Sequence, residues 1–227
     1  MQPYLFPYIG YIQLINAVDR FVVFDDVNYI NKGWINRNRI LVNGEPHTFT
    51  IPLKEASQNK LIKDIDIEAG DKWRDKLIKT IQQSYLKAPY YAEVFPLVKE
   101  IIYNQQPNLS DFVGNSIKLI AEFLDITAVI IPSSQKYHNQ QLRAEERIID
   151  ICIQEAANEY VNLIGGMELY SKSNFDAKGI RLSFIKTKEI SYKQLGKPFV
   201  PALSIIDVMM FCSKPEIKTQ LAQVELI

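Results

Sequence analysis

The sequence predicts an α/β protein with a mostly parallel sheet, flanking helices, a β-hairpin and a helical insertion. In the second half of the chain, single apolar stretches alternate with helical patterns, which is typical of βαβ units. Asn43-Gly44 lies inside an alternating stretch, as in a two-residue hairpin. Amphipathic patterns fill residues 71–124. We therefore expect one domain over residues 1–227 with a helical subregion at 71–124.

The first part of the chain is expected to contain a helix, a strand and a hairpin. The segment "GYIQLINAVD" has apolar residues at helical spacing, and "RFVVFDD" contains a short apolar run. These patterns predict a short helix followed by a buried strand at 21–24. Alternation over 34–53 predicts the hairpin, and alternation in "IKDIDIE" predicts a third strand before Gly70.

The remaining elements follow from periodicity and helix breaks. Amphipathic patterns predict helices at 71–86, from the Pro89 break through 102, and at 108–125, the last with an Asn or Ser cap. Next we expect a strand in "AVIIP", a helix over 140–157, a strand at 160–163, a short helix after Gly165-Gly166, a strand at 180–185 and a helix at 205–210.

Composition argues against several classes of protein. The 26 basic and 26 acidic residues cancel, so no global charge attracts nucleic acid or an anionic membrane. The longest apolar run, "LDITAVIIP", is shorter than the roughly 20 residues of a membrane span, and no signal-peptide pattern opens the chain. Cys152 and Cys212 lie in apolar contexts, which predicts buried free thiols. The cytoplasm is the expected location.

The opening stretch "QPYLFPYIGY" resembles the loop that follows a first strand. A buried strand normally precedes such a turn in an α/β domain, so we expect a few residues upstream of Met1. Gly10 permits close backbone approach, and a loop that leads into a helix N-terminus can bind an anion. The alternative is a packed aromatic turn.

The stretch "NKGWINRNRI" contains three cations, Lys32, Arg37 and Arg39, in a window without acidic residues. Unpaired cations repel, so a phosphate or carboxylate ligand would explain the cluster. On a strand, Trp34 would share one face with Asn36 and Asn38, and the arginines would lie on the other. The alternative is that the arginines pair with Asp25, Asp26 or helix acids while Trp34 packs.

Other polar residues follow predicted strands. Asp25 and Asp26 end the first strand, where ligands often bind in open sheets, and they are candidates for a general base or a metal contact. They could equally be turn or cap residues. Ser133-Ser134 follow a later strand without a nucleophile-elbow pattern. His47 and His138 are beside no Cys/His ligand set, so no metal site is predicted.

Several blocks together resemble the WbqC-like protein family over nearly the whole chain. These blocks are "MQPYLFPYIGYIQL", "FDDVNYINKGWINRNRI", "FTIPL", "ELYSKSNFDAKGIRLSFI", "SYKQ" and "LSIIDVMM". The resemblance implies a role in bacterial surface-polysaccharide synthesis, including O-antigen. The family's pattern falls on Gln2, Pro3, Pro7, Gly10, Asp25, Asp26, Trp34, Asn36, Arg37, Asn38, Arg39, Tyr170, Gly179, Gln194, Ser204 and Asp207. Many relatives have histidine where this chain has Met1.

A second resemblance concerns architecture only. "YIGY", residues 8–11, resembles the His-x-Gly-His loop of nucleotidylyltransferase-like enzymes, with both histidines replaced by tyrosine. Those enzymes hold ATP phosphates on this loop, and Ser133-Ser134 would match a second phosphate loop. Without the histidines the architecture transfers better than adenylyl transfer does.

The expected function is a transferase that attaches an acyl or aminoacyl group to a nucleotide-linked amino sugar. The alternative is a non-catalytic protein of the same pathway that binds a nucleotide sugar. Nucleic-acid binding is disfavoured because three cations make a small footprint. No cofactor or oligomeric state can be named. Catalysis is assigned to Asp25 and Asp26, and substrate binding to Gln2, Tyr8, Gly10, Tyr11, Lys32, Trp34, Asn36, Arg37, Asn38, Arg39, Ser133, Ser134, Tyr170 and Gln194.

Overall fold

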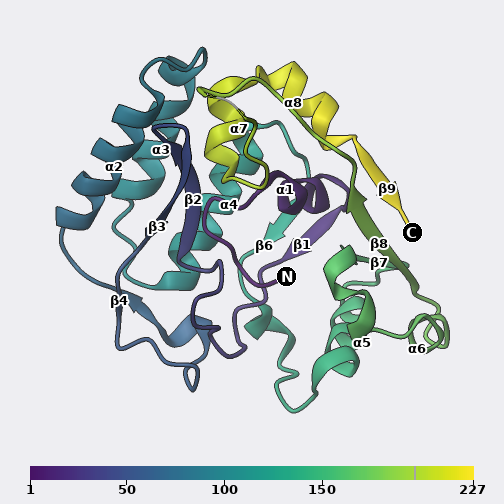
Figure 1. The fold of residues 1–227 in the computed structure, drawn as a ribbon. Helices are drawn as coiled ribbons and strands as arrows, with labels where there is room; N and C mark the ends of the chain where they lie inside the picture. Colours follow the sequence, from purple (N-terminus) through teal and green to yellow (C-terminus); the bar gives the residue numbers. More distant parts are fainter. Residues whose placement is uncertain (197) are drawn as a thin grey trace.

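The computed structural model, which describes residues 1–196 and 198–227, combines helices with short strands (Figure 1). The α-helices are α1 (Ile9–Asn16), α2 (Lys72–Tyr85), α3 (Tyr91–Tyr103), α4 (Leu109–Phe123), α5 (Ala144–Gln154), α6 (Lys172–Asp176), α7 (Ile205–Phe211) and α8 (Lys214–Leu221). Short 3₁₀ turns are η1 (Ile62–Asp64), η2 (Ser134–Tyr137) and η3 (Ile164–Leu169). The mixed α/β class is confirmed.

The strands form four short sheets. They are β1 (Arg20–Val22), β2 (Arg37–Val42), β3 (Glu45–Thr50), β4 (Leu53–Lys54), β5 (Asp66–Ile67), β6 (Val129–Ile131), β7 (Glu159–Leu163), β8 (Arg181–Thr187) and β9 (Val224–Leu226). Parallel pairing joins β1 to β6 and β7 to β8, and β9 adds an antiparallel strand to β8. Within the described residues, β1 and β7 each keep one edge without a partner strand.

The predicted hairpin is confirmed in strands β2 and β3. Asn43 and Gly44 have φ angles of +53° and +83°, and Val42 pairs with Glu45 across the turn. Two positive φ angles are what a type I′ turn needs. The third strand predicted from "IKDIDIE" forms only at β5, which pairs with β4, because Ile62–Asp64 turn as η1.

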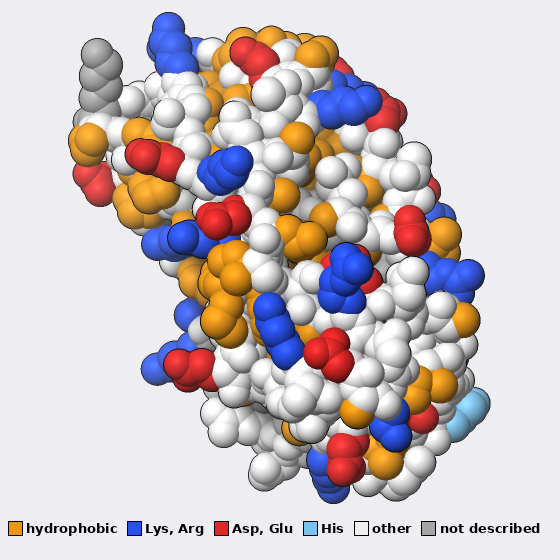
Figure 2. Space-filling view, turned by 90° about the vertical axis from the view of Figure 1, so that its right-hand side faces the viewer, with side chains coloured by type: hydrophobic (Ala, Val, Ile, Leu, Met, Phe, Trp, Pro, Cys, Tyr) orange, Lys and Arg blue, Asp and Glu red, His pale blue; other side chains and the backbone are white. Residues whose placement is uncertain are grey.

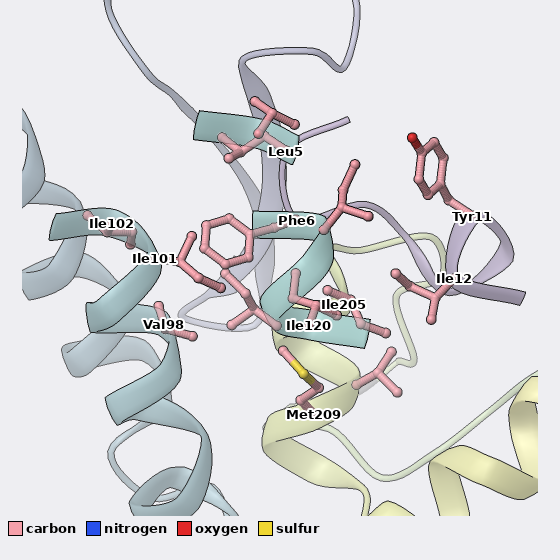
Figure 3. Packing of buried hydrophobic residues seen from close by; sticks show 14 of the residues in the cluster. Leu5, Phe6, Tyr11, Ile12, Val98, Ile101, Ile102, Ile120, Ile205 and Met209 are labelled. Atoms are coloured by element: carbon pink, nitrogen blue, oxygen red, sulfur yellow. The ribbon is translucent and has the colours of Figure 1, made fainter. Parts of the chain in front are cut away.

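The helical subregion packs its apolar stripes against the opening loop and α7. The predicted stripe of α2 is buried at Leu77, Ile78, Ile81 and Tyr85. The predicted cap of α4 is also present, since the side chain of Asn108 accepts from the backbone N–H groups of the first turn. Figure 3 shows side chains of α3, α4 and α7 packed around Phe6 of the loop and Ile12 of α1. The helices contribute Val98, Ile101, Ile120, Ile205 and Met209.

Surface and thiol properties agree with the composition. On the face turned to the viewer in Figure 2, basic and acidic side chains are interspersed. Cys152 and Cys212 are buried free thiols, as predicted. In the part of the chain that the structure describes, no helix combines the length and apolarity needed to cross a membrane.

The opening loop is fixed by side chains distant in sequence. Asn38 Nδ2 donates to the carbonyl oxygens of Leu5 at 2.9 Å and Phe6 at 2.7 Å. Ser204 Oγ donates to the Phe6 oxygen at 2.9 Å, while Ile205 N–H donates to Pro7 O at 2.8 Å. These bonds satisfy carbonyl groups that the loop cannot pair within itself, so β2 and the start of α7 set the loop's position.

Replacing Asn38 with alanine is expected to destabilise the protein by about 2–3 kcal/mol, because the Leu5 carbonyl loses its side-chain donor and the Phe6 carbonyl keeps only that of Ser204. Urea unfolding measures the change. Asn59→Ala is the matched control, since that side chain is exposed, and its effect should stay within about 0.5 kcal/mol. Equal effects of the two substitutions would show that Asn38 does not hold the loop.

Candidate functional site

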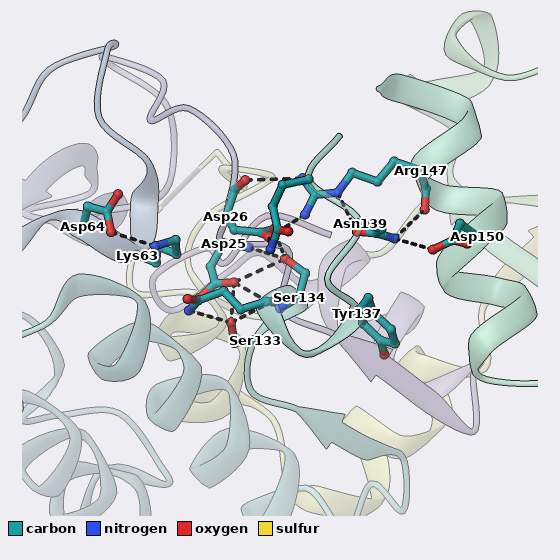
Figure 4. Close-up of polar contacts among 12 residues, drawn as sticks. Asp25, Asp26, Lys63, Asp64, Ser133, Ser134, Tyr137, Asn139, Arg147 and Asp150 are labelled. Carbon is teal, nitrogen blue, oxygen red and sulfur yellow. Dashed lines mark hydrogen bonds and ion pairs between the residues drawn. The ribbon is translucent and has the colours of Figure 1, made fainter. Parts of the chain in front are cut away.

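Asp25 lies where β1 and β6 end side by side, because the two strands are parallel (Figure 4). Its Oδ2 accepts from Ser110 Oγ at 2.8 Å, and its Oδ1 accepts from Ser133 Oγ at 2.8 Å and Ser134 N–H at 3.1 Å. Ser110 belongs to the first turn of α4. The carboxylate therefore ties β1 to the loop after β6 and to α4.

Asp26 forms a buried ion pair with Arg147 of α5. Its side chain is 0% exposed and that of Arg147 is 7% exposed. Asp26 also accepts from Ser134 Oγ and from Gln140 Nε2 at 3.1 Å, and Arg147 Nε donates to Asn139 Oδ1 at 2.9 Å. Figure 4 shows this network reaching from Ser133 to α5.

These contacts are structural, but they join distant segments and are not the local turn or cap contacts that the sequence left open as an alternative. Each carboxylate already has several donors from the protein, and both residues are buried. A general base needs a lone pair directed at its substrate. Catalysis by Asp25 or Asp26 stays a prediction, and it requires substrate groups to replace protein donors.

Trp34 lies close to two arginines. The Cζ atoms of Arg37 and Arg39 are each 5.5 Å from the centroid of its ring, and the side chain is partly exposed. Residues 33–36 form a bend before β2 begins at Arg37. The bend turns Trp34 toward the arginines, so the predicted face shared with Asn36 and Asn38 is wrong, because the strand geometry starts only after Trp34.

The two arginines are oriented by backbone carbonyl groups. Arg37 Nε donates to Gly33 O at 3.0 Å and its Nη2 donates to Lys32 O, while Arg39 Nη2 donates to Ala202 O at 3.2 Å. Within residues 1–196 and 198–227, neither arginine nor Lys32 lies within 4.0 Å of a carboxylate oxygen, and Arg39 Nε is buried without a partner. The pairing with Asp25, Asp26 or helix acids considered above is therefore not formed.

The side-chain amides of Asn36 and Asn38 are hydrogen-bonded within the protein and do not face an open site. Asn36 accepts from Tyr29 Oη and donates to Ile51 O, both at 2.8 Å. Asn38 holds the opening loop, as described above. Both residues are buried, so neither amide is free to orient a ligand in this conformation.

The opening loop is a packed aromatic turn. Tyr11 is fully buried and its hydroxyl donates to Gln2 O at 2.8 Å. A Cβ on Gly10 would lie 2.5 Å from Tyr8 Cε2 and 2.9 Å from Thr187 Oγ1. The glycine therefore makes room for the protein's own side chains. Tyr11, which replaces the second histidine of nucleotidylyltransferase-like loops, is therefore buried with its hydroxyl bonded to the protein's own backbone.

Two further predicted site residues, Tyr170 and Gln194, contact other residues than these. Tyr170 packs edge-on against Tyr160 and Phe175, with ring centroids 5.6 and 6.0 Å away. Gln194 Nε2 donates to Asp207 Oδ2 at 2.8 Å and to Val200 O at 3.0 Å. Gln194 thus anchors the segment that leads to Ala202, which in turn accepts from Arg39.

Asp207 is the centre of a buried network that sequence analysis did not identify. It accepts hydrogen bonds from Tyr85 Oη, Tyr192 Oη and Gln194 Nε2 at 2.7–2.8 Å. Burial raises the pKa of the Asp207 carboxyl above its ordinary value, against the effect of these donors. The network connects α2 and α7 with Tyr192 and Gln194, and Gln194 bonds to Val200, close in sequence to the Ala202 carbonyl that accepts from Arg39.

Comparison with known proteins adds to this geometry. The model of the WbqC-like protein family matches residues 2–219. The chain belongs to the WbqC-like family. A curated relative, the uncharacterised protein Rv1507c of Mycobacterium tuberculosis, is 29% identical over 206 residues, which cover 89% of this chain and 88% of that protein. No solved structure matches.

In this WbqC-like protein, eight of the predicted site residues fall into two clusters. Asp25, Asp26, Ser133 and Ser134 form one cluster with Ser110 and Arg147, and Lys32, Trp34, Arg37 and Arg39 form the other. Arg147 was missed. A signal existed, since Arg147 lies four residues before the buried Ile151 on the apolar side of a predicted helix. A cation there indicates a buried acidic partner.

Breaking the Asp26–Arg147 pair from one side is expected to destabilise the protein by about 3–5 kcal/mol, because it leaves a buried charge without its partner. We predict this loss for Arg147→Met and partial recovery in Asp26→Asn/Arg147→Met. A double-mutant cycle by denaturant unfolding measures the coupling. Additive effects would show that the pair contributes no specific stability.

Proposed function

We propose that this protein is a transferase in surface-glycan precursor synthesis, which attaches an acyl or aminoacyl group to a nucleotide-linked amino sugar. The observation that supports it best is the partly exposed ring of Trp34 close to Arg37 and Arg39, two arginines that have no acidic partner among the described residues. Membership in the WbqC-like family, with its association with polysaccharide synthesis, supports the choice of pathway.

The chemistry of this cluster suits a ligand that has both a ring and an anionic group. Guanidinium groups bind phosphate or carboxylate oxygens through paired N–H donors, and both arginines have part of their donors already oriented by carbonyl groups. The unpartnered Nε of Arg39 adds a donor that a ligand oxygen would satisfy. A base or sugar ring would stack on the open part of Trp34.

Acyl transfer to an amine also needs a group that accepts a proton. Of the two predicted acids, Asp25 is the better candidate, because its partners are hydroxyl groups and a backbone N–H, whereas Asp26 is paired with a buried arginine. Neutral donors can be exchanged for substrate groups at lower cost than a buried counter-ion. In this proposal Asp26 positions Asp25 and the Ser133-Ser134 loop.

The same observations leave a second candidate function. The protein could bind a nucleotide sugar without turning it over, because both carboxylates are filled by protein donors. Binding by Arg37 and Arg39 is common to the two functions. They differ only in product formation.

Thermal unfolding with a UDP-linked amino sugar, and separately with ATP, tests the binding part. We expect a ligand-induced rise in Tm for the unmodified chain and its loss in Arg37→Ala and Arg39→Ala, since each substitution removes donors to the anion. Arg181→Ala removes an exposed arginine from β8 and should keep the full rise. Unfolding of the two site variants without ligand would show that these arginines are structural.

Mass spectrometry of the ligand after incubation with an acyl or aminoacyl donor separates the two functions. A mass increase that is lost in Asp25→Asn supports the transferase. A thermal shift without any mass change supports the binding protein.

A further inference from the structure

A groove of about 630 Å³ runs between β1 and β7. The residues of the two clusters described above do not line it, although Phe24, next to Asp25, does. Residues 19–22 line it from one side and residues 157–162 from the other. Helices α1 and α5 contribute Leu14, Ile148 and Ile151. Figure 1 shows α1 above and α5 below the level of β1 and β7. The groove is thus bounded by two strand edges and two helices. An inner strand of an α/β sheet has the same neighbours.

Backbone groups of both strands face this groove. In the pairing of β1 with β6, Val129 N–H donates to Asp19 O and Val23 N–H donates to Ile131 O. Backbone groups alternate in direction along a parallel ladder, so the C=O of Arg20 and the N–H of Val22 point to the opposite edge. By the same alternation, Val161 of β7 directs its N–H and C=O away from β8.

Met1 already occupies one end of the groove in strand geometry. Its amino group donates to Val22 O at 2.9 Å, and its carbonyl oxygen accepts from Phe24 N–H at 2.8 Å. These are the two bonds of a parallel bridge between Met1 and Val23. Chain added upstream of Met1 in the same direction would bring its next paired residue to the free C=O of Arg20 and N–H of Val22.

The amino group of Met1 is poorly suited to this position. Burial lowers the pKa of the Met1 ammonium from 8.0 to about 5, and its bond to Val22 O is to a neutral carbonyl. A peptide N–H would make the same bond without a buried charge. The polar groups that face the groove thus match a peptide backbone.

We propose that this groove receives a β-strand parallel to β1 and paired on its other edge with β7, as chain that continues from Met1 in the upstream direction would form. About five residues match the length of β7. Because α1 and α5 cover both faces, the strand is apolar at every position, with Val or Ile side chains against Leu14 and Ile151. The inference is independent of the proposed transferase activity.

Three chains test the proposal: the sequence from Met1, the same sequence with a five-residue Val/Ile extension, and a matched Gly/Ser extension. The Gly/Ser extension removes the buried charge of the Met1 amino group but supplies no apolar side chains. The Val/Ile extension is expected to raise Tm by about 10 °C over the Gly/Ser chain, through apolar burial and edge pairing. A lysine at the central position of the Val/Ile extension should cancel this gain.

Amide hydrogen exchange gives a second readout at named positions. We expect Val22 and Val161 N–H to exchange about 100-fold more slowly in the Val/Ile chain than in the Gly/Ser chain. Equal Tm values and equal exchange in the two extended chains would overturn the proposal. So would concentration-dependent protection in the unextended chain, which would show that a second copy fills the groove.

Discussion

Two adjacent buried carboxylates, Asp25 and Asp26, determine how the carboxyl end of β1 meets the rest of the molecule. Asp25 accepts from α4 and from the loop after β6, and Asp26 accepts from that loop and from α5. Charges in this position are unfavourable unless each is paired and hydrogen-bonded. The end of β1, the loop after β6, α4 and α5 must therefore be in place together. They fix the carboxyl ends of the strands, where ligands commonly bind in open sheets.

The cationic cluster depends on a different kind of support. Arg37 and Arg39 are held by carbonyl oxygens, which orient a guanidinium group without neutralising it. Among the described residues no carboxylate oxygen lies within 4.0 Å of these cations, and Asp26 is paired with Arg147. The separation keeps two arginines on one exposed ring available to an anion. Asp207 contributes indirectly, because it anchors Gln194 and so the segment that contains Ala202.

Local signals in the sequence predicted the hairpin, the α4 cap and the buried thiols, because each depends on a few neighbouring residues. The partner of Asp26 lies 121 positions away, and only the misplaced charge of Arg147 on an apolar face pointed to it. Trp34 was assigned to the wrong face because a bend over 33–36 precedes the strand. The capping box of α8, Ser213 with Glu216, was present as a local pattern and was overlooked. Which strands are neighbours depends on tertiary packing, and no local pattern contains that information.

The groove between β1 and β7 connects these observations. With a strand in it, the two parallel pairs become one sheet, and the opening loop starts from the carboxyl end of the inserted strand. Such a strand would lead through α1 to β1 on one side and have β7 on the other, which would put the loop where the direction of chain connections reverses, the usual ligand position in open α/β sheets. The loop is bonded to the cationic cluster through Leu5 N–H, which donates to Trp34 O at 3.2 Å, and through Asn38. Order in the groove and the position of Trp34 are therefore linked by a short, continuous series of backbone contacts.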